Sequence, residues 1–404
     1  MCQGGKFMAK VMAVNAGSSS LKFKLFEMPE EKVICSGLVG RIGKEDAEFK
    51  FVLNDQKEEK VLPVLTYTYA VELVLKTLLE KGVVKHLEEI QGVGHRIVQG
   101  GKYFKDSVKF DDDVEKKVEE LISLAPLHNG AHLIGLRAIK EALPHVGNVA
   151  VFDTAFHQTM EPQDYMFPVP YEWYEKYDIR RYGAHGTSHK YLSHEGMKFV
   201  DKKENVRMIT CHLGSGASIT AIKDGKCVAT SMGLTPLGGI MMGTRCGDID
   251  PSVVTYACEK TGMTPEQMFQ TLNKQSGLKG FSGVDDDSRN VLKAMREGNK
   301  RAELAIDLWV RRVVDYIGQY YVRLGGCDLL VFSAGVGEND GYLRQRVVDG
   351  IAEALGVKLK PEQLTIRGEE AVLSTDDSKI KVVLIPTDEE LMIARDTCRI
   401  LNIK

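Results

Sequence analysis

This chain of 404 residues has neither an excess of one charge nor a long apolar run. Its 53 lysines and arginines nearly balance 56 aspartates and glutamates, for a net charge of −3, which argues against a dedicated nucleic-acid-binding protein or a basic membrane-surface protein. No apolar segment approaches the ~18 residues that a membrane span needs. The amino terminus also lacks a hydrophobic region with a cleavage site. We therefore expect a cytoplasmic protein without a membrane or nucleic-acid partner.

Several motifs are missing as well. Eight cysteines are scattered without a C-x-x-C pair, which argues against a zinc ribbon and a disulfide scaffold. No G-x-x-x-x-G-K-[ST] segment occurs, which excludes a Walker-type NTPase, and the protein-kinase signatures are absent. Gly335 and Gly337 fail the dinucleotide-binding spacing, because Asp340 stands where the third glycine should fall. The length suggests two or three domains with a large core.

A buried strand, a glycine turn and a second strand occur twice, at residues 11–25 and 207–222. Aligning the two segments with an offset of 197 residues matches Gly17 with Gly214 and Ser18 with Ser215. This offset is close to half the chain. Because strand, turn and strand recur at the head of each half, we expect duplicated α/β domains.

The rest of the pattern supports alternating strands and helices. Asp111 and its acidic neighbours predict a helix start, followed by apolar residues at helical spacing. A strand at residues 327–332 is expected to lead into a third glycine turn, Ser333–Asn339. A strand at residues 381–385 is expected to precede a helix with Thr387 as N-cap and Glu390 at N3 of a capping box.

Three glycine turns, around Gly17, Gly214 and Gly335, therefore each follow a predicted strand. Glycine lets backbone N–H groups approach phosphate oxygens, and serines in the first two turns add hydroxyl donors. Each turn alone is explained as well by an ordinary tight turn. Three in one chain favour a phosphate site.

Arginines and histidines lie in glycine-rich segments. Arg96 and Arg245 each stand near glycines, where a guanidinium can bind a carboxylate or phosphate through two hydrogen bonds. A surface arginine is the usual alternative. His185 and His189 have a spacing that suits metal ligands on a helix, but Gly183 and its neighbours favour a loop. We expect His185 to face a phosphate.

Acidic residues follow the same pattern of strand and helix ends. Asp153 ends a strand, where α/β sheets place ligand-binding groups, and Glu389 begins a helix. Dispersed carboxylates beside phosphate-binding turns suggest Mg²⁺, which is usually held by one or two carboxylates, waters and phosphate oxygens. Asp285–Asp287 is explained either by a solvated loop or, with the following Ser288 and Arg289, by a nucleotide contact.

These motifs together resemble acetate kinase. The segments that carry the resemblance span nearly the whole chain in the order of that family: Val14–Lys22, Gly94–Arg96, Phe152–His157, Tyr182–His189, His212–Gly216, Gly243–Pro251, Gly335–Asn339 and Thr387–Leu391. The resemblance implies duplicated actin-like (ribonuclease H-like) α/β domains with a cleft between them. It implies residues 8–153, completed by a helix at 388–404, for the first domain and residues 154–387 for the second. It also implies a homodimer.

The implied reaction is reversible, Mg²⁺-dependent phosphoryl transfer from ATP to acetate, giving acetyl phosphate and ADP, with Mn²⁺ as a substitute metal. The resemblance assigns catalytic roles to Asp153, His185 and Arg245. It assigns substrate binding to Arg96, Val98, Leu127 and Pro236, and the metal to Asn15 and Glu389. It assigns nucleotide binding to Lys22, His212, Leu213, Gly214, Ser215, Gly216, Asp287, Ser288, Arg289, Gly335, Val336, Gly337, Glu338 and Asn339. Because acetate is already ionised at neutral pH, we expect Asp153 mainly to orient Mg²⁺ or Arg245.

The sequence departs from the family pattern at Gln99, Ala184, Ser215 and Gly239, where His, Phe, Asn and Glu are common. Ala184 precedes His185, so the lost ring suggests a larger acyl pocket and some use of propionate. The alternative is that Ala184 points away from the substrate. A propionate-preferring or pyrophosphate-dependent kinase of the same fold remains an alternative, and so does an actin-like or Hsp70-like ATPase.

Overall fold

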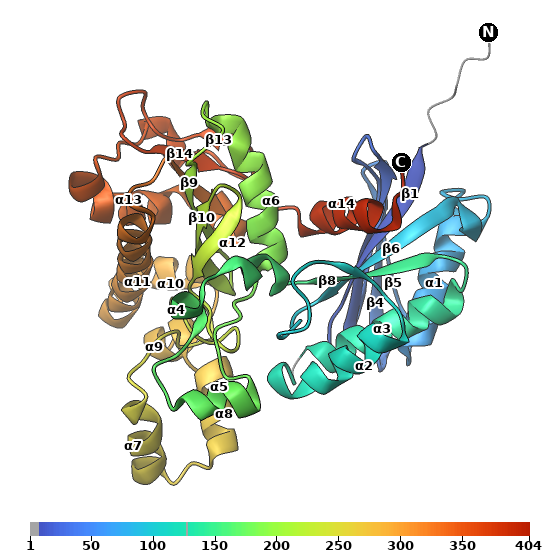
Figure 1. Ribbon diagram of the computed structural model, residues 1–404, viewed down its shortest axis with the longest axis horizontal. Helices are drawn as coiled ribbons and strands as arrows, with labels where there is room; N and C mark the ends of the chain where they lie inside the picture. Colours follow the sequence, from blue (N-terminus) through green and yellow to red (C-terminus); the bar gives the residue numbers. More distant parts are fainter. Residues whose placement is uncertain (1–7, 127) are drawn as a thin grey trace. The chain divides into compact units, whose positions relative to one another are not determined.

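The computed structural model describes residues 8–126 and 128–404 of the chain. The chain forms two compact units (Figure 1). Unit 1 contains the chain up to Phe156 together with Asp388–Lys404, and unit 2 contains His157–Thr387. The last helix therefore belongs to the same unit as the first strand.

Unit 1 is built on one eight-stranded sheet with the order β5-β4-β3-β2-β1-β6-β8-β7. Its strands are β1 (Ala9–Ala16), β2 (Ser20–Met28), β3 (Lys32–Gly40), β4 (Lys44–Leu53), β5 (Gln56–Val64), β6 (Ile90–Ile97), β7 (Val108–Lys109) and β8 (Gly147–Phe152). The first five strands are joined by antiparallel pairing, whereas β1, β6 and β8 run parallel to one another. The three parallel strands thus end at one edge of the sheet.

The longer helices of unit 1 are α1 (Tyr67–Glu80), α2 (Asp112–Glu120), α3 (Asn129–Ala142) and α14 (Glu389–Leu401). Asp111 caps α2 by accepting a hydrogen bond from the N–H of Val114 at 2.9 Å, which confirms the predicted helix start. Helix α3 contacts β1, β6 and α1, and α14 packs on β1, β6 and β8, as Figure 1 also shows.

Unit 2 has a six-stranded sheet with the order β11-β10-β9-β12-β14-β13. Its strands are β9 (Arg207–Leu213), β10 (Ala217–Lys223), β11 (Lys226–Thr230), β12 (Leu329–Ser333), β13 (Ala371–Val372) and β14 (Lys381–Leu384). Strands β9, β10 and β11 pair antiparallel, and β9, β12 and β14 run parallel. This arrangement repeats the order and directions of β3-β2-β1-β6-β8 in unit 1, so the predicted duplication is confirmed in the topology.

The helices of unit 2 are α4 (Pro162–Tyr165), α5 (Tyr171–Tyr177), α6 (Gly186–Gly196), α7 (Ser252–Thr261), α8 (Pro265–Lys274), α9 (Gly277–Ser282), α10 (Ser288–Arg296), α11 (Lys300–Leu324), α12 (Ala334–Asn339) and α13 (Gly341–Leu355). Asn299 caps the long α11 through hydrogen bonds from the N–H groups of Arg301 and Ala302. Helix α11 contacts β9 and β10, whereas α6 contacts β9 and β12.

Three local predictions were wrong. Residues 334–339 form the short helix α12 rather than a glycine turn, because Ala334 takes a positive φ of 64° and turns the chain directly from β12 into the helix. Asp388 rather than Thr387 caps α14, since its side chain accepts from the N–H of Leu391 at 3.0 Å. His189 lies on a helix, since the glycine after His185 begins α6 instead of continuing a loop.

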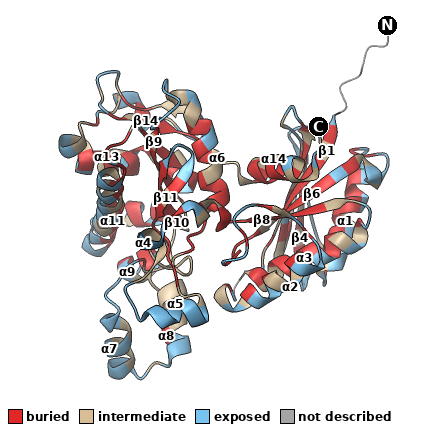
Figure 2. Ribbon diagram, in the orientation of Figure 1, coloured by how far each residue is buried: buried red, intermediate tan, exposed pale blue. Residues whose placement is uncertain are grey.

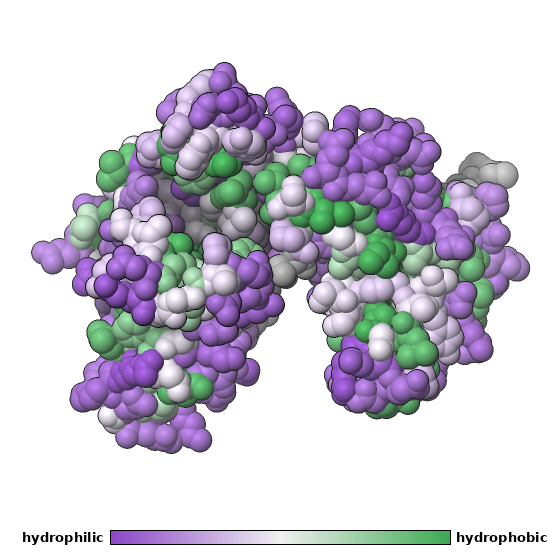
Figure 3. Space-filling model, turned by 90° about the horizontal axis from the view of Figure 1, so that it is seen from below, coloured by the Kyte–Doolittle hydropathy of each residue, from purple (hydrophilic) through white to green (hydrophobic). Residues whose placement is uncertain are grey.

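Buried residues concentrate on the strands and on the helix faces that cover them (Figure 2). The largest hydrophobic cluster of unit 2 includes Ile209, Trp309 and Phe332, and the largest of unit 1 includes Phe23, Phe49 and Leu78. Neither unit supplies, within the described residues, a helix long and apolar enough to cross a membrane. The face in Figure 3 is mostly hydrophilic, with apolar residues in separate patches.

Candidate active site

Three polar residues lie at the carboxyl ends of the parallel strands of unit 1. Asn15 lies near the end of β1, Arg96 near the end of β6, and Asp153 directly after β8. The strand register pairs Val14 with His95 and Arg96 with Val151, so the three residues meet at the same edge of the sheet. This edge is where open α/β sheets bind their ligands.

Arg96 and Asp153 form a charged pair at this edge. The Nε and Nη2 atoms of Arg96 donate to Oδ2 of Asp153 at 2.9 and 2.6 Å, and the Asp153 side chain is only 1% exposed. This contact links Asp153 to Arg96, in addition to its expected role in orienting Mg²⁺ or Arg245. Burial opposes the charge of Arg96, yet Asp153 and then Glu389 outweigh it and raise the pKa of the guanidinium. The arginine therefore stays charged.

Glu389 adds a second carboxylate from the first residue of α14. Its Oε2 lies 3.8 Å from Nε of Arg96. Burial, together with the charges of Asp153 and Glu390, raises the pKa of Glu389 to about 7, although Arg96 opposes the shift. Such crowding of acids is relieved when a cation binds between them.

These residues suit a divalent cation that is shared with a ligand. No group of three His, Cys, Asp or Glu side chains among the described residues would hold a metal by itself. Mg²⁺, however, commonly uses one or two carboxylates and completes its shell with water and phosphate oxygens. Asp153 and Glu389 supply two carboxylates, and the amide of Asn15 lies near the end of β1. The donor set therefore fits Mg²⁺ bound together with a nucleotide.

Two lysines on β2 hold the start of α14. Nζ of Lys24 lies 3.0 Å from Asp388 and 3.4 Å from Glu390, the two neighbours of Glu389. Lys22 makes an ion pair with Glu390 while 52% of its side chain stays exposed. Lys22, which was predicted to contact the nucleotide, is therefore already paired with Glu390.

His132 on α3 is a neighbour of this group that the sequence did not single out. It is 4% exposed, and burial, followed by the nearby charge of Arg96, lowers the pKa of its imidazole to about 3. His132 is therefore neutral at neutral pH. The sequence signal was weak, because one histidine on the buried face of a helix is usually a core residue.

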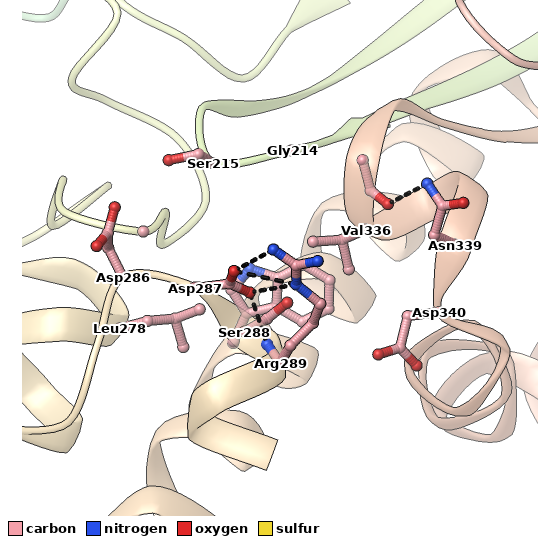
Figure 4. Close-up of a pocket in the computed structure, with 13 residues that line it drawn as sticks. Gly214, Ser215, Leu278, Asp286, Asp287, Ser288, Arg289, Val336, Asn339 and Asp340 are labelled. Atoms are coloured by element: carbon pink, nitrogen blue, oxygen red, sulfur yellow. Dashed lines mark hydrogen bonds and ion pairs between the residues drawn. The ribbon is translucent and has the colours of Figure 1, made fainter. Parts of the chain in front are cut away.

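The corresponding edge of unit 2 holds a cavity of about 420 Å³ (Figure 4). This volume lies in the range of small-molecule and cofactor sites. The cavity is lined by Gly214, Ser215, Gly243, Leu278, Asp286, Asp287, Ser288, Arg289, Trp309, Gly335, Val336, Asn339 and Asp340. Its walls thus come from the turn after β9, the start of α10, the helices α9 and α11, and the helix α12 that follows β12.

The cavity brings together all three segments that were predicted to bind nucleotide. From these segments it takes Gly214 and Ser215, then Asp287, Ser288 and Arg289, and finally Gly335, Val336 and Asn339. Leu278, Trp309 and the acidic Asp286 and Asp340 also line it and were not predicted. The two apolar residues come from helices whose pattern reads as ordinary core, so no motif distinguished them.

The other nucleotide residues predicted in unit 2, which are His212, Leu213, Gly216, Gly337 and Glu338, do not line the cavity. Oε1 of Glu338 accepts hydrogen bonds from the N–H groups of Ala334 at 2.8 Å and Thr387 at 3.0 Å. Glu338 thereby joins the chain segments that follow β12 and β14, which supports the cavity wall.

Asp287 and Arg289 form a local pair at the start of α10. Asp287 caps this helix, and both of its carboxylate oxygens accept from Nε of Arg289 at 3.0 Å (Figure 4). The Arg289 side chain is nevertheless 84% exposed, so it can change partners at little cost when an anion arrives.

His185 and Arg245 approach the glycine turn between β9 and β10. A Cβ atom at Gly216 would stand 3.4 Å from Nη1 of Arg245 and 3.5 Å from Nε2 of His185. Nη1 of Arg245 also donates to the carbonyl oxygen of Pro236 at 3.2 Å. Two donors of the kind that stabilises phosphoryl oxygens therefore converge at this turn, beside the residues that line the cavity.

The structure describes two of the three residues predicted for the acyl pocket. Val98 is buried just after β6 in unit 1, and Pro236 lies in unit 2 beside Arg245. The predicted Leu127 lies outside the described residues. Ala184 is 2% exposed within the hydrophobic core of unit 2, and its carbonyl accepts from Nε2 of His157 at 2.9 Å. This burial favours the alternative in which Ala184 does not border the substrate.

Comparison with known proteins agrees with these observations. A family model described as the Acetokinase family matches residues 10–395. Acetate kinase from Bacillus subtilis (strain 168) is 50% identical over 394 residues, covering 97% of this chain and 100% of that protein. The crystal structure of Porphyromonas gingivalis acetate kinase has a TM-score of 0.93 at 43% identity, and that of a propionate kinase from Francisella tularensis has 0.91 at 39%. Each covers 97% of this chain and 100% of the other.

Proposed function

This chain belongs to the acetokinase family, and we propose from that premise that it transfers a phosphoryl group reversibly from ATP to acetate, giving acetyl phosphate and ADP. The observation that carries the proposal is the convergence of His185 and Arg245 on Gly216, in the same turn that supplies Gly214 and Ser215 to the cavity. A site that only bound a nucleotide would have no need of these two donors beside the phosphate-binding turn.

The residues divide the work of the reaction. The cavity of unit 2 binds the nucleotide, and Arg245 and His185 stabilise charge on the equatorial oxygens of the transferring group. Arg96 binds the carboxylate of acetate, while Asp153 holds the Arg96 guanidinium in place through its two hydrogen bonds. Val98 and Pro236 supply apolar contacts for the methyl group. Since acetate is the nucleophile in its ionised form, no general base is required.

Mg²⁺ is the proposed cofactor, with Mn²⁺ as a substitute. Glu389 and Asn15 would hold it, Asp153 would orient its water ligands, and the ion would neutralise charge on the nucleotide phosphates. The support is the burial of Glu389 and the crowding of carboxylates around it, which together raise the pKa of this group to about 7.

We further propose a homodimer in the cytoplasm. Helix α5 exposes three large aromatic residues, with Tyr171 60%, Trp173 41% and Tyr177 63% exposed. Exposed apolar surface of this kind is typical of protein interfaces. The described cysteines, from Cys35 to Cys398, are free thiols, which suits a reducing compartment.

The test is a hydroxamate assay with acetate, ATP and Mg²⁺. Hydroxylamine traps acetyl phosphate as acetohydroxamate, so the account predicts product that depends on all three components. The same assay with propionate should give less product at equal concentration. ATP hydrolysis that acetate does not change, without hydroxamate, would instead support an ATPase of the same fold.

A further inference from the structure

A continuous chain of hydrogen bonds runs from His185 into the core of unit 2. Nδ1 of His185 lies 2.9 Å from Oγ of Ser218, and the same Oγ lies 2.8 Å from Nε2 of His189. Nδ1 of His189 then lies 2.7 Å from Oγ1 of Thr210. Ser218, His189 and Thr210 are each fully buried. Three consecutive hydrogen bonds therefore connect a proposed catalytic ring to the middle of the sheet.

Ser218 and His212 hold the ring of His185 from two directions. Ser218 lies directly opposite His212 in the β9–β10 register, and the ring of His212 stacks on that of His185 with 4.2 Å between centroids. His212 is itself fixed by Ser188, whose Oγ lies 2.8 Å from its Nδ1. With one nitrogen bonded and one face covered, the ring presents its Nε2 toward Gly216 and Arg245.

We propose that Ser218 is a positioning residue for phosphoryl transfer: its hydroxyl holds Nδ1 of His185 so that Nε2 faces the transferring group. The proposal rests on the function proposed above. A 1 Å displacement of a catalytic group is enough to cost about a hundredfold in rate. Holding one ring nitrogen is therefore a direct route from a core serine to the rate of the reaction.

The contacts also indicate which atom donates the proton in each of these three hydrogen bonds. Oγ1 of Thr210 lies 3.5 Å from the carbonyl oxygen of Thr220, which can only accept, and we therefore assign Nδ1–H of His189 as the donor to Thr210. Burial lowers the pKa of His189 well below its usual value, so this ring is neutral and its Nε2 accepts. Ser218 then donates to His189 and accepts from Nδ1–H of His185. His185 therefore acts as a donor in its imidazolium form, with Nδ1–H bonded to Ser218 and Nε2–H directed at the transferring group.

A purely structural role would not require these residues. A buried run of two histidines, a serine and a threonine must satisfy every polar atom, and apolar side chains would fill the same space without that cost. This series of hydrogen bonds ends on His185, which lies with Arg245 at the phosphate-binding turn. A role in positioning His185 explains why these polar residues are buried and why the series of hydrogen bonds reaches this ring.

The experiment compares Ser218→Ala and Ser218→Thr with a matched control, Ser374→Ala. Ser374 is also a buried serine of unit 2, and it accepts one hydrogen bond from the N–H of Val382 at 3.0 Å. In the hydroxamate assay we expect Ser218→Ala to lower kcat roughly 10- to 100-fold. The KM values for ATP and acetate should stay within about twofold, and Ser218→Thr should recover much of the lost kcat. A kcat for Ser218→Ala that matches that of Ser374→Ala would overturn the proposal.

A second measurement does not depend on turnover. Proton–nitrogen NMR of protein with ¹⁵N-labelled histidine should show a bound proton on Nδ1 of His185, assigned by its loss in His185→Gln. This signal should disappear or exchange rapidly in Ser218→Ala while remaining in Ser374→Ala. An unchanged signal in Ser218→Ala would refute the positioning role, whether or not the wild-type protein phosphorylates acetate. A wild-type protein that fails to phosphorylate acetate would count only against the proposed function.

Discussion

Units 1 and 2 share a five-stranded arrangement but place different chemistry at the same edge. In unit 1 the parallel strands end at a charged pair, Arg96 and Asp153, joined by Glu389 from a helix that follows much later in the chain. In unit 2 they end at glycine-rich segments, a cavity of about 420 Å³ and the donors His185 and Arg245. One topology therefore serves two tasks.

The difference shows which parts of a duplicated fold are free to change. Both sheets need a hairpin followed by parallel strands, and both need a tight turn after the first strand. The side chains at the strand ends are not needed by either core. In unit 1 they became groups that suit an anionic acceptor and a metal, and in unit 2 groups that suit a nucleotide and its phosphates.

The largest effect should come from removing either arginine. We expect Arg96→Ala and Arg245→Ala each to lower kcat/KM for acetate by about 10²–10³ or more, because each removes a charged donor from the reacting centre. Arg→Lys should recover little, since a point charge does not reproduce the guanidinium fork. Steady-state hydroxamate kinetics measure both.

The two arginines should nevertheless differ in stability. Arg96→Ala leaves the buried carboxylate of Asp153 without its partner, so this variant should also melt at a lower temperature. Nη1 of Arg245 donates to the carbonyl oxygen of Pro236 and contacts Sδ of Met242, and neither of these partners is a charge that its loss would leave buried, so we expect a milder effect. Near-normal activity in Arg245→Ala would remove this residue from the catalytic set.

The next largest effect should change the KM for ATP without changing the KM for acetate. Val336→Asp places a carboxylate in the cavity wall of unit 2 and should raise the KM for ATP by roughly tenfold or more, since burying an unpaired charge beside an anionic ligand is unfavourable. The KM for acetate should change little. Val322→Asp, at a position of α11 that is 79% exposed, is the control and should leave both constants unchanged.

The sequence predicted where the strands and glycine segments lie better than it predicted which side chains contact one another. Alternation and buried runs located β1, β2, β9 and β10, because the period of side chains in a strand is set locally. The pairing of Arg96 with Asp153 was missed, since 57 residues separate them and only the sheet joins them. Leu278 and Trp309 were missed for the same reason: tertiary packing alone turns a core residue into a cavity wall.

A smaller effect concerns Ala184. Because this residue lies in the core of unit 2, Ala184→Phe should overpack it and lower the free energy of unfolding by about 1–3 kcal/mol or more. The ratio of kcat/KM for acetate and propionate should stay within about twofold. A ratio that shifts strongly toward acetate, with an unchanged melting temperature, would place Ala184 at the acyl pocket after all.

The smallest effect is a pH dependence in unit 1. Burial lowers the pKa of His95 to about 4, although its hydrogen bond with Asn148 at 2.8 Å opposes the shift. Between pH 6.5 and 4 the unfolded chain binds more protons at this group than the folded chain, so stability falls as the pH falls. The contribution is about 2 kcal/mol between pH 7 and 5. In urea unfolding, His95→Gln should lose less free energy of unfolding than the wild type between pH 7 and 5. An equal loss in the two proteins would mean that His95 is not buried as a neutral group.

The central claim is that unit 2 binds the nucleotide and that the charged edge of unit 1 serves the acceptor. Calorimetric titration of ADP with Mg²⁺ into Arg96→Ala and Val336→Asp tests it most directly. The account predicts that Arg96→Ala binds ADP within about threefold of the wild-type affinity, whereas Val336→Asp loses at least tenfold. Equal losses in the two variants, or a loss confined to Arg96→Ala, would contradict this division.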